Sequence, residues 1–148
     1  MIKNVLVVCV GNICRSPLGE RLLQSKVPEL HVTSAGIGAL VGKPADKTAS
    51  EVAAEHGVSL DGHAARQATA ELLGAADLIL VMEAGHKTAV GKIAPQIMGR
   101  VMLADHWSGP SDVADPYKMS REFHEHVFTQ MNSAMDQWAK RLSTISGS

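Results

Sequence analysis

Residues 7–17, VVCVGNICRSP, place an apolar run directly before a loop that holds both cysteines of the chain. The run covers residues 5–10 as Val-Leu-Val-Val-Cys-Val, a pattern typical of a parallel strand that is covered on both faces. Ser16 and Pro17 then predict the start of a helix, because serine caps helices and proline needs no N–H donor in the first turn. The stretch therefore predicts a strand, a loop and a helix in succession.

The rest of the chain repeats this alternation. Further strands are predicted at residues 31–34, 78–82 and 101–103, and helices after Pro17 and at residues 46–56, 69–73 and 84–92. A last helix, capped by Ser120, carries apolar residues at three- and four-residue steps from Phe123 to Leu142. The alternation predicts an α/β chain: a three-layer doubly wound fold with a central four-stranded parallel sheet and helices on both faces.

Length and composition limit the class of protein. The 148 residues fit a single domain, residues 1–148, and 45% hydrophobic with 20% charged residues is ordinary for a globular protein. A net charge of -1 gives no general attraction to nucleic acid or anionic lipid, and the N-terminal apolar run is too short to insert in a membrane. We therefore expect a cytoplasmic location, where closely spaced cysteines more often bind metal or react than form a disulfide framework.

The loop from Cys9 to Arg15 has the features of an anion site. Open α/β sheets bind ligands at the carboxyl ends of their strands, and loop N–H groups next to a helix N-terminus converge on an anion. Gly11 allows close backbone approach, and Arg15 adds two donors for a tetrahedral oxyanion. A Cys9 thiolate in that cradle is a nucleophile directed at phosphorus. The alternative is an inert cysteine buried at a strand end, and the surrounding pattern favours the catalytic interpretation.

A second candidate lies before the last helix, where Asp115, Pro116 and Tyr117 follow one another. A thiolate that attacks a phosphate ester needs a general acid for the leaving oxygen, and Asp115 is a candidate. Tyr117 is a candidate wall for a planar group, although an Asp-Pro turn with a surface tyrosine is the alternative. Motifs for nucleotide, zinc and serine-hydrolase sites do not match, so we expect no metal and no cofactor.

Four motifs together resemble the low-molecular-weight protein tyrosine phosphatases along nearly the whole chain. They are VCVGNICRSP at residues 8–17, SAG at 34–36, GHAARQ at 62–67 and DPY at 115–117. The stretches SAGIGALVGKPAD and ADPYKMSREFHEHV look most like the bacterial branch tied to capsule and exopolysaccharide production. Members of that branch act on an autophosphorylating tyrosine kinase, so the resemblance implies such a partner.

The resemblance also implies roles for individual residues. Cys9 would form a phosphocysteine, Arg15 would bind the phosphoryl oxygens, and Asp115 would act first as acid and then as base. The implied substrate-binding set is Val10, Gly11, Asn12, Ile13, Cys14, Ser16, Leu40 and Tyr117, with Ser34 and His63 supporting the loop. Ser16 would also assist the thiolate. The predicted activity is hydrolysis of protein phosphotyrosine, with a capsule-controlling bacterial kinase as substrate.

Some roles have more than one interpretation. His63 fits either the loop network or a surface turn, and Cys14 either packs beneath the loop or forms a reversible disulfide that protects Cys9. No aromatic residue lies near Leu40, and Lys118 replaces the second tyrosine of eukaryotic members, so the substrate preference stays open.

Two other functions are alternatives to a phosphatase. An arsenate reductase of this fold would need a further cysteine, and a phosphotyrosine-binding module would not need Asp115 or a reactive Cys9.

Overall fold

The protein is built around one parallel sheet. The computed structural model describes the backbone of residues 1–147 and the side chains of residues 1–143. Its strands are β1 (Asn4–Cys9), β2 (His31–Gly36), β3 (Leu78–Val81) and β4 (Val101–Leu103), in the order β2-β1-β3-β4 with every neighbouring pair parallel. The predicted strands and the predicted fold class are confirmed, and β2 continues two residues beyond the expected range.

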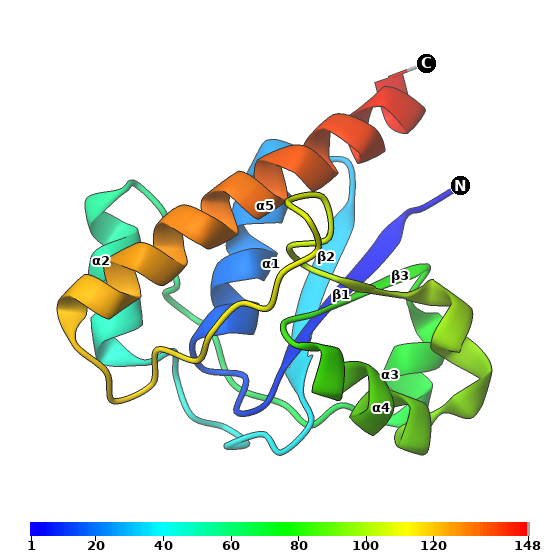
Figure 1. The fold of residues 1–148 in the computed structure, drawn as a ribbon, viewed down its shortest axis with the longest axis horizontal. Helices are drawn as coiled ribbons and strands as arrows, with labels where there is room; N and C mark the ends of the chain where they lie inside the picture. Colours follow the sequence, from blue (N-terminus) through cyan, green and yellow to red (C-terminus); the bar gives the residue numbers. More distant parts are fainter. Residues whose placement is uncertain (148) are drawn as a thin grey trace.

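Helices cover both faces of this sheet, which gives three layers (Figure 1). One face packs against α1 (Arg15–Lys26) and α5 (Arg121–Gly147), with α2 (Lys47–Glu55) beside α5. The other face packs against α3 (Ala70–Ala75), α4 (Ala84–Ile93) and a short 3₁₀ helix, η1 (Pro95–Arg100). Within residues 1–147 we find no helix with the length and apolar character needed to cross a membrane.

Strand β1 shows why its sequence is continuously apolar. Val5 and Val7 join the hydrophobic core under α1 and α5, whereas Leu6 and Val8 join the core under α3 and α4. Successive side chains of a strand point to opposite faces, so a strand covered on both sides needs apolar residues throughout. Burial on both faces fixes β1 in the centre of the sheet and thereby fixes where the loop after Cys9 begins.

The start of α1 differs from the prediction. The helix begins at Arg15 with Cys14 in the cap position, and among the described side chains none caps its first turn. The expected Ser16 cap is wrong because the Ser16 hydroxyl points back into the loop, where it lies 2.9 Å from Cys9 Sγ. At α5 the expectation holds, since Ser120 Oγ accepts a hydrogen bond from the backbone N–H of Phe123 at 3.2 Å.

Candidate active site

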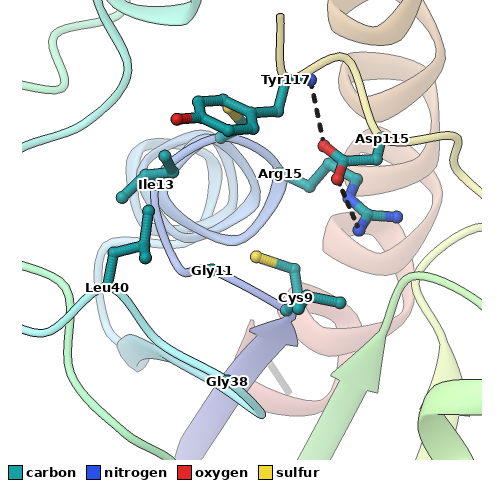
Figure 2. A pocket seen from close by; sticks show the side chains of 10 residues that line it. Cys9, Gly11, Ile13, Arg15, Gly38, Leu40, Asp115 and Tyr117 are labelled. Carbon is teal, nitrogen blue, oxygen red and sulfur yellow. Dashed lines mark hydrogen bonds and ion pairs between the residues drawn. The ribbon is translucent and has the colours of Figure 1, made fainter.

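A pocket of about 190 Å³ opens at the carboxyl end of β1 (Figure 2). Three separate segments meet there: the loop after β1, the segment after β2 and the segment before α5. The structure thus brings together residues that are more than a hundred positions apart in the sequence. The lining residues are Cys9, Val10, Gly11, Ile13, Cys14, Arg15, Gly38, Leu40, Asp115 and Tyr117. Of the predicted substrate-binding set, Asn12 and Ser16 are buried and do not line the pocket.

The Cys9 sulfur points into this pocket (Figure 2). It also has a hydrogen-bond partner in the Ser16 hydroxyl. Asn12 Nδ2 donates to Ser16 Oγ at 2.7 Å, so the hydroxyl oxygen already acts as an acceptor. Its single hydrogen is then free to point at Cys9 Sγ, 2.9 Å away. Ser16 therefore presents a donor to the sulfur, which is the arrangement a thiolate requires.

Asn12 holds the loop in its unusual shape. Its φ of 59° lies in the left-handed region, which asparagine tolerates better than most side chains, and its side chain is fully buried. Nδ2 also donates to Ser34 Oγ at 3.0 Å, and Oδ1 accepts from the Arg66 backbone N–H at 2.9 Å. His63 Nε2 lies 2.6 Å from the Asn12 carbonyl, so this nitrogen must carry the proton. His63 is thus buried and bonded to the loop, and Ser34 contacts the Asn12 side chain in the same network.

The strand behind the loop, β2, ends in Gly36 because the loop leaves no room there for a side chain. A Cβ atom at this position would lie 2.3 Å from the Val10 carbonyl oxygen and 3.0 Å from the Asn12 Cβ. Neither neighbour is the far end of a flexible side chain, so any larger residue would displace the loop. The glycine of the SAG motif therefore allows β2 to support the pocket loop by direct backbone contact.

Arg15 is buried beneath the pocket and is held by a residue that the sequence did not reveal. Nη1 donates to Glu83 Oε2 at 2.5 Å and to the Val113 carbonyl at 2.8 Å, while Nη2 faces Asp115 Oδ2 at 3.8 Å. Glu83 comes just after β3, and the carboxyl ends of parallel strands meet at one edge of the sheet. Its position after a predicted strand was therefore the sequence signal that could have placed it near Arg15. His86 shares a capping box with Glu83. Burial of the His86 ring, followed by the positive charge of Arg15, lowers the pKa of His86, so the ring is neutral at neutral pH.

We expect Glu83→Ala to lower kcat/KM for an aryl phosphate by up to about 10²-fold, because Arg15, the predicted ligand of the phosphoryl oxygens, would lose the anchor that orients it. The charge-neutral Glu83→Gln keeps an acceptor for Arg15, so its loss should be smaller. Steady-state kinetics and thermal melting of both variants test this. Unchanged kcat/KM in a folded Glu83→Ala protein would show that Arg15 needs no such anchor.

Asp115 and Tyr117 close one side of the pocket (Figure 2). Asp115 Oδ1 accepts the backbone N–H of Tyr117 at 3.1 Å, which fixes the turn, and its side chain is half exposed. The pocket is walled by apolar groups, with Leu40 and Ile13 across from the Tyr117 ring. A half-exposed carboxyl group above a buried cysteine and arginine is placed to exchange protons with a bound group and with water.

Cys14 also lines the pocket, and its thiol is hard to ionise. Burial raises the pKa of the Cys14 thiol well above its usual range, and the negative charge of Asp46 adds to this. Cys14 therefore stays protonated at neutral pH. Cys9 and Cys14 are both free in the structure.

Comparisons with known proteins identify the family of the chain. The family model described as low molecular weight phosphotyrosine protein phosphatase matches residues 4–146. The chain is 53% identical to the low molecular weight protein-tyrosine-phosphatase Wzb of Escherichia coli K12, over 97% of each chain.

Two solved structures are also similar to it. The tyrosine phosphatase AmsI of Erwinia amylovora has a TM-score of 0.94 and 50% identity, and the match covers 95% of this chain and 93% of that one. Wzb of Vibrio vulnificus, solved with benzylphosphonate, has a TM-score of 0.94 and 47% identity, covering 95% and 99%. A family model that spans residues 4–146, together with relatives about half identical over nearly their whole length, shows that the chain is a protein-tyrosine phosphatase of the low molecular weight phosphotyrosine protein phosphatase family.

Proposed function

We propose that the chain hydrolyses phosphotyrosine in proteins through a phosphocysteine formed at Cys9. The observation that carries this proposal is the meeting of Cys9, Arg15 and Asp115 in one pocket, with the sulfur pointing inward. In the first step the Cys9 thiolate attacks phosphorus in line with the leaving tyrosyl oxygen. The sulfur–phosphorus bond forms as the phosphorus–oxygen bond breaks, and Asp115 gives its proton to the departing phenolate.

Arg15 and the loop N–H groups stabilise this transfer by binding the three phosphoryl oxygens where charge is spread in the transition state. The anchor at Glu83 leaves Arg15 little freedom, so the guanidinium is oriented before the substrate arrives. In the second step Asp115, now a carboxylate, takes a proton from the attacking water. The sulfur–phosphorus bond breaks, inorganic phosphate leaves, and the Cys9 thiolate is restored.

We further propose that the physiological substrate is an autophosphorylating bacterial tyrosine kinase involved in capsule or exopolysaccharide production. The support is the likeness of SAGIGALVGKPAD and ADPYKMSREFHEHV to that branch of the family. The proposal includes one phosphatase domain over residues 1–148 acting in the cytoplasm, and the span of the family model supports the single domain.

Parallel assays with phosphotyrosine peptide, phosphoserine peptide and arsenate test the proposed reaction. Rapid release of phosphate from phosphotyrosine alone is the expected result, and arsenate reduction or equal use of phosphoserine would overturn it. A second assay follows the phosphotyrosine content of an autophosphorylated bacterial kinase. If the kinase keeps its phosphate while the peptide loses it, the kinase part of the proposal fails and the reaction stands.

The family resemblance also leads us to expect that Cys14 protects Cys9 during oxidation. Peroxide converts the Cys9 thiolate to a sulfenic acid, and the Cys14 sulfur then displaces water to form a disulfide, a net loss of two hydrogens. Because burial raises the Cys14 pKa, its thiolate is scarce, and bridge closure after a peroxide pulse should become faster between pH 7 and pH 9.

Mass spectrometry before and after thiol treatment measures this bridge. The expected product lacks two hydrogens and returns to the starting mass with thiol. A Cys14→Ser control should instead gain oxygen at Cys9 under the same peroxide dose. Irreversible oxygen addition at Cys9 in the unmodified sequence would contradict the protective role.

A further inference from the structure

The turn beside the pocket holds a lysine in a backbone conformation that lysine rarely adopts. Lys118 has a φ of 63°, and the turn around it is closed by the Met119 N–H donating to the Pro116 carbonyl at 2.9 Å. Among residues 1–147 the other non-glycine residue with positive φ is Asn12, whose shape is explained by the buried loop network. Glycine or asparagine would fit the turn with less strain. Such strain in a site loop is a reason to look for a function of the side chain.

The Lys118 side chain folds back over the pocket wall. Its ammonium nitrogen lies 5.4 Å from the centre of the Tyr117 ring, within the range of a cation–π contact. Tyr117 lines the pocket, and both residues are exposed to solvent. The backbone turn and the ring contact together place a positive charge beside the wall that Tyr117 forms, although Lys118 itself does not line the pocket.

Few of the residues in the segments that line the pocket carry a positive charge. Of the residues that line the pocket and those next to them in the sequence, all within the described chain, Arg15 and Lys118 are the cations. Arg15 is only 2% exposed and is paired with Glu83, so it is directed at the phosphoryl group and not at the surroundings of the substrate. A residue that flanks a bound phosphotyrosine on the Tyr117 side would therefore meet Lys118 as an exposed cation, close in the chain to the half-exposed carboxyl group of Asp115.

The opposite rim has a different character. Val10 and Leu40 line the pocket, are apolar and are each 43% exposed. A peptide that places its phosphotyrosine in the pocket would thus pass apolar side chains on one side and an ammonium group on the other. The two sides differ enough to distinguish one sequence around the phosphotyrosine from another.

We propose that Lys118 is a specificity-determining residue, which favours protein substrates with an acidic side chain next to the phosphotyrosine. The inference rests on the proposed phosphotyrosine hydrolysis and adds the class of substrate sequence to it. The acidic side chain would lie over the Tyr117 side of the rim and pair with the Lys118 ammonium group. Exposed ion pairs are weak, so we expect a preference of about 2- to 5-fold in kcat/KM.

Two phosphotyrosine peptides test this directly, one with Asp and Glu beside the phosphotyrosine and one with Asn and Gln in the same places. The measured quantity is the ratio of their kcat/KM values on the same enzyme sample, because any loss of folded protein cancels in that ratio. We expect about 2- to 5-fold in favour of the acidic peptide at low salt, and a smaller ratio at high salt.

Variants of the lysine then assign the preference. Lys118→Asn keeps a residue that tolerates the turn and should bring the ratio close to one, Lys118→Glu should reverse it, and Lys118→Arg should keep it. Lys92→Asn, on the exposed surface of α4, makes the same charge change away from the pocket and should leave the ratio as it is.

A ratio of one in the unmodified protein, or the same ratio in Lys118→Asn, would overturn this inference. Failure of the proposed function has a different signature, because then the unmodified protein would hydrolyse neither peptide.

Discussion

Replacing Cys9 by serine is expected to reduce turnover of phosphotyrosine and of aryl phosphates by roughly 10⁴- to 10⁶-fold, the loss typical for removal of an enzymatic nucleophile. Serine has nearly the same shape and keeps a hydrogen-bonding partner for Ser16, which lies 2.9 Å from the Cys9 sulfur. Its hydroxyl is far less acidic than a thiol, however, so at neutral pH it stays protonated and is a poor nucleophile. The fold should therefore survive while the chemistry stops.

Two measurements separate these effects. Thermal melting of Cys9→Ser should stay close to that of the unmodified protein, and the variant should still bind inorganic phosphate, because Arg15 and the loop N–H groups are intact. Retention of substantial turnover by a folded Cys9→Ser protein would remove Cys9 from the role of nucleophile.

The second large effect is expected for Asp115→Asn, which keeps the size of the side chain and removes its ability to donate a proton. For a poor leaving group such as phenolate, kcat/KM should fall by about 10²- to 10⁴-fold, the usual contribution of general-acid catalysis. For a good leaving group such as p-nitrophenolate, the same variant should lose much less kcat/KM, because that oxygen leaves without a proton. The difference between the two substrates identifies the proton donor.

The structure offers a matched control for this substitution. Asp61 is an exposed aspartate in a loop outside the pocket, so Asp61→Asn makes the same chemical change without touching the site. We expect its kcat/KM to match that of the unmodified protein for both leaving groups. A small and equal loss for both substrates in Asp115→Asn would show that another group supplies the proton. In that case the half-exposed Asp115 side chain would only stabilise the turn, by accepting the backbone N–H of Tyr117.

Much of this architecture follows from local sequence patterns. Strands β1, β3 and β4 were predictable because each is a short, mostly apolar run, and β1 needs apolar residues on both faces. The edge strand β2 reads HVTSAG and has a weaker apolar signal. Cys9 and Arg15 were predictable as a pair because one loop contains both, so their proximity depends on six residues of chain rather than on the tertiary fold. Such features can be predicted from sequence because they depend on residues close together in the chain.

The features that sequence did not reveal depend on long-range contacts. Glu83 anchors Arg15 from the end of another strand, 68 positions away. The Arg66 backbone N–H holds Asn12 across 54 positions. The predicted Ser16 cap failed for the same reason, because the tertiary network around Asn12 and Cys9 draws the hydroxyl away from the helix terminus. The left-handed turn at Lys118 has no signal in its residue type, since lysine does not favour that conformation.

Detection of a covalent intermediate tests directly whether the reaction passes through a phosphocysteine at Cys9. Unmodified protein is mixed with a phosphotyrosine peptide, quenched with acid within milliseconds, and digested for mass spectrometry. We expect one added phosphoryl group on the peptide that contains Cys9, lost when the quench is delayed until the substrate is consumed. Phosphate on a different residue, or release of phosphate with no phosphorylated enzyme at any time, would contradict a reaction that passes through a Cys9 phosphocysteine.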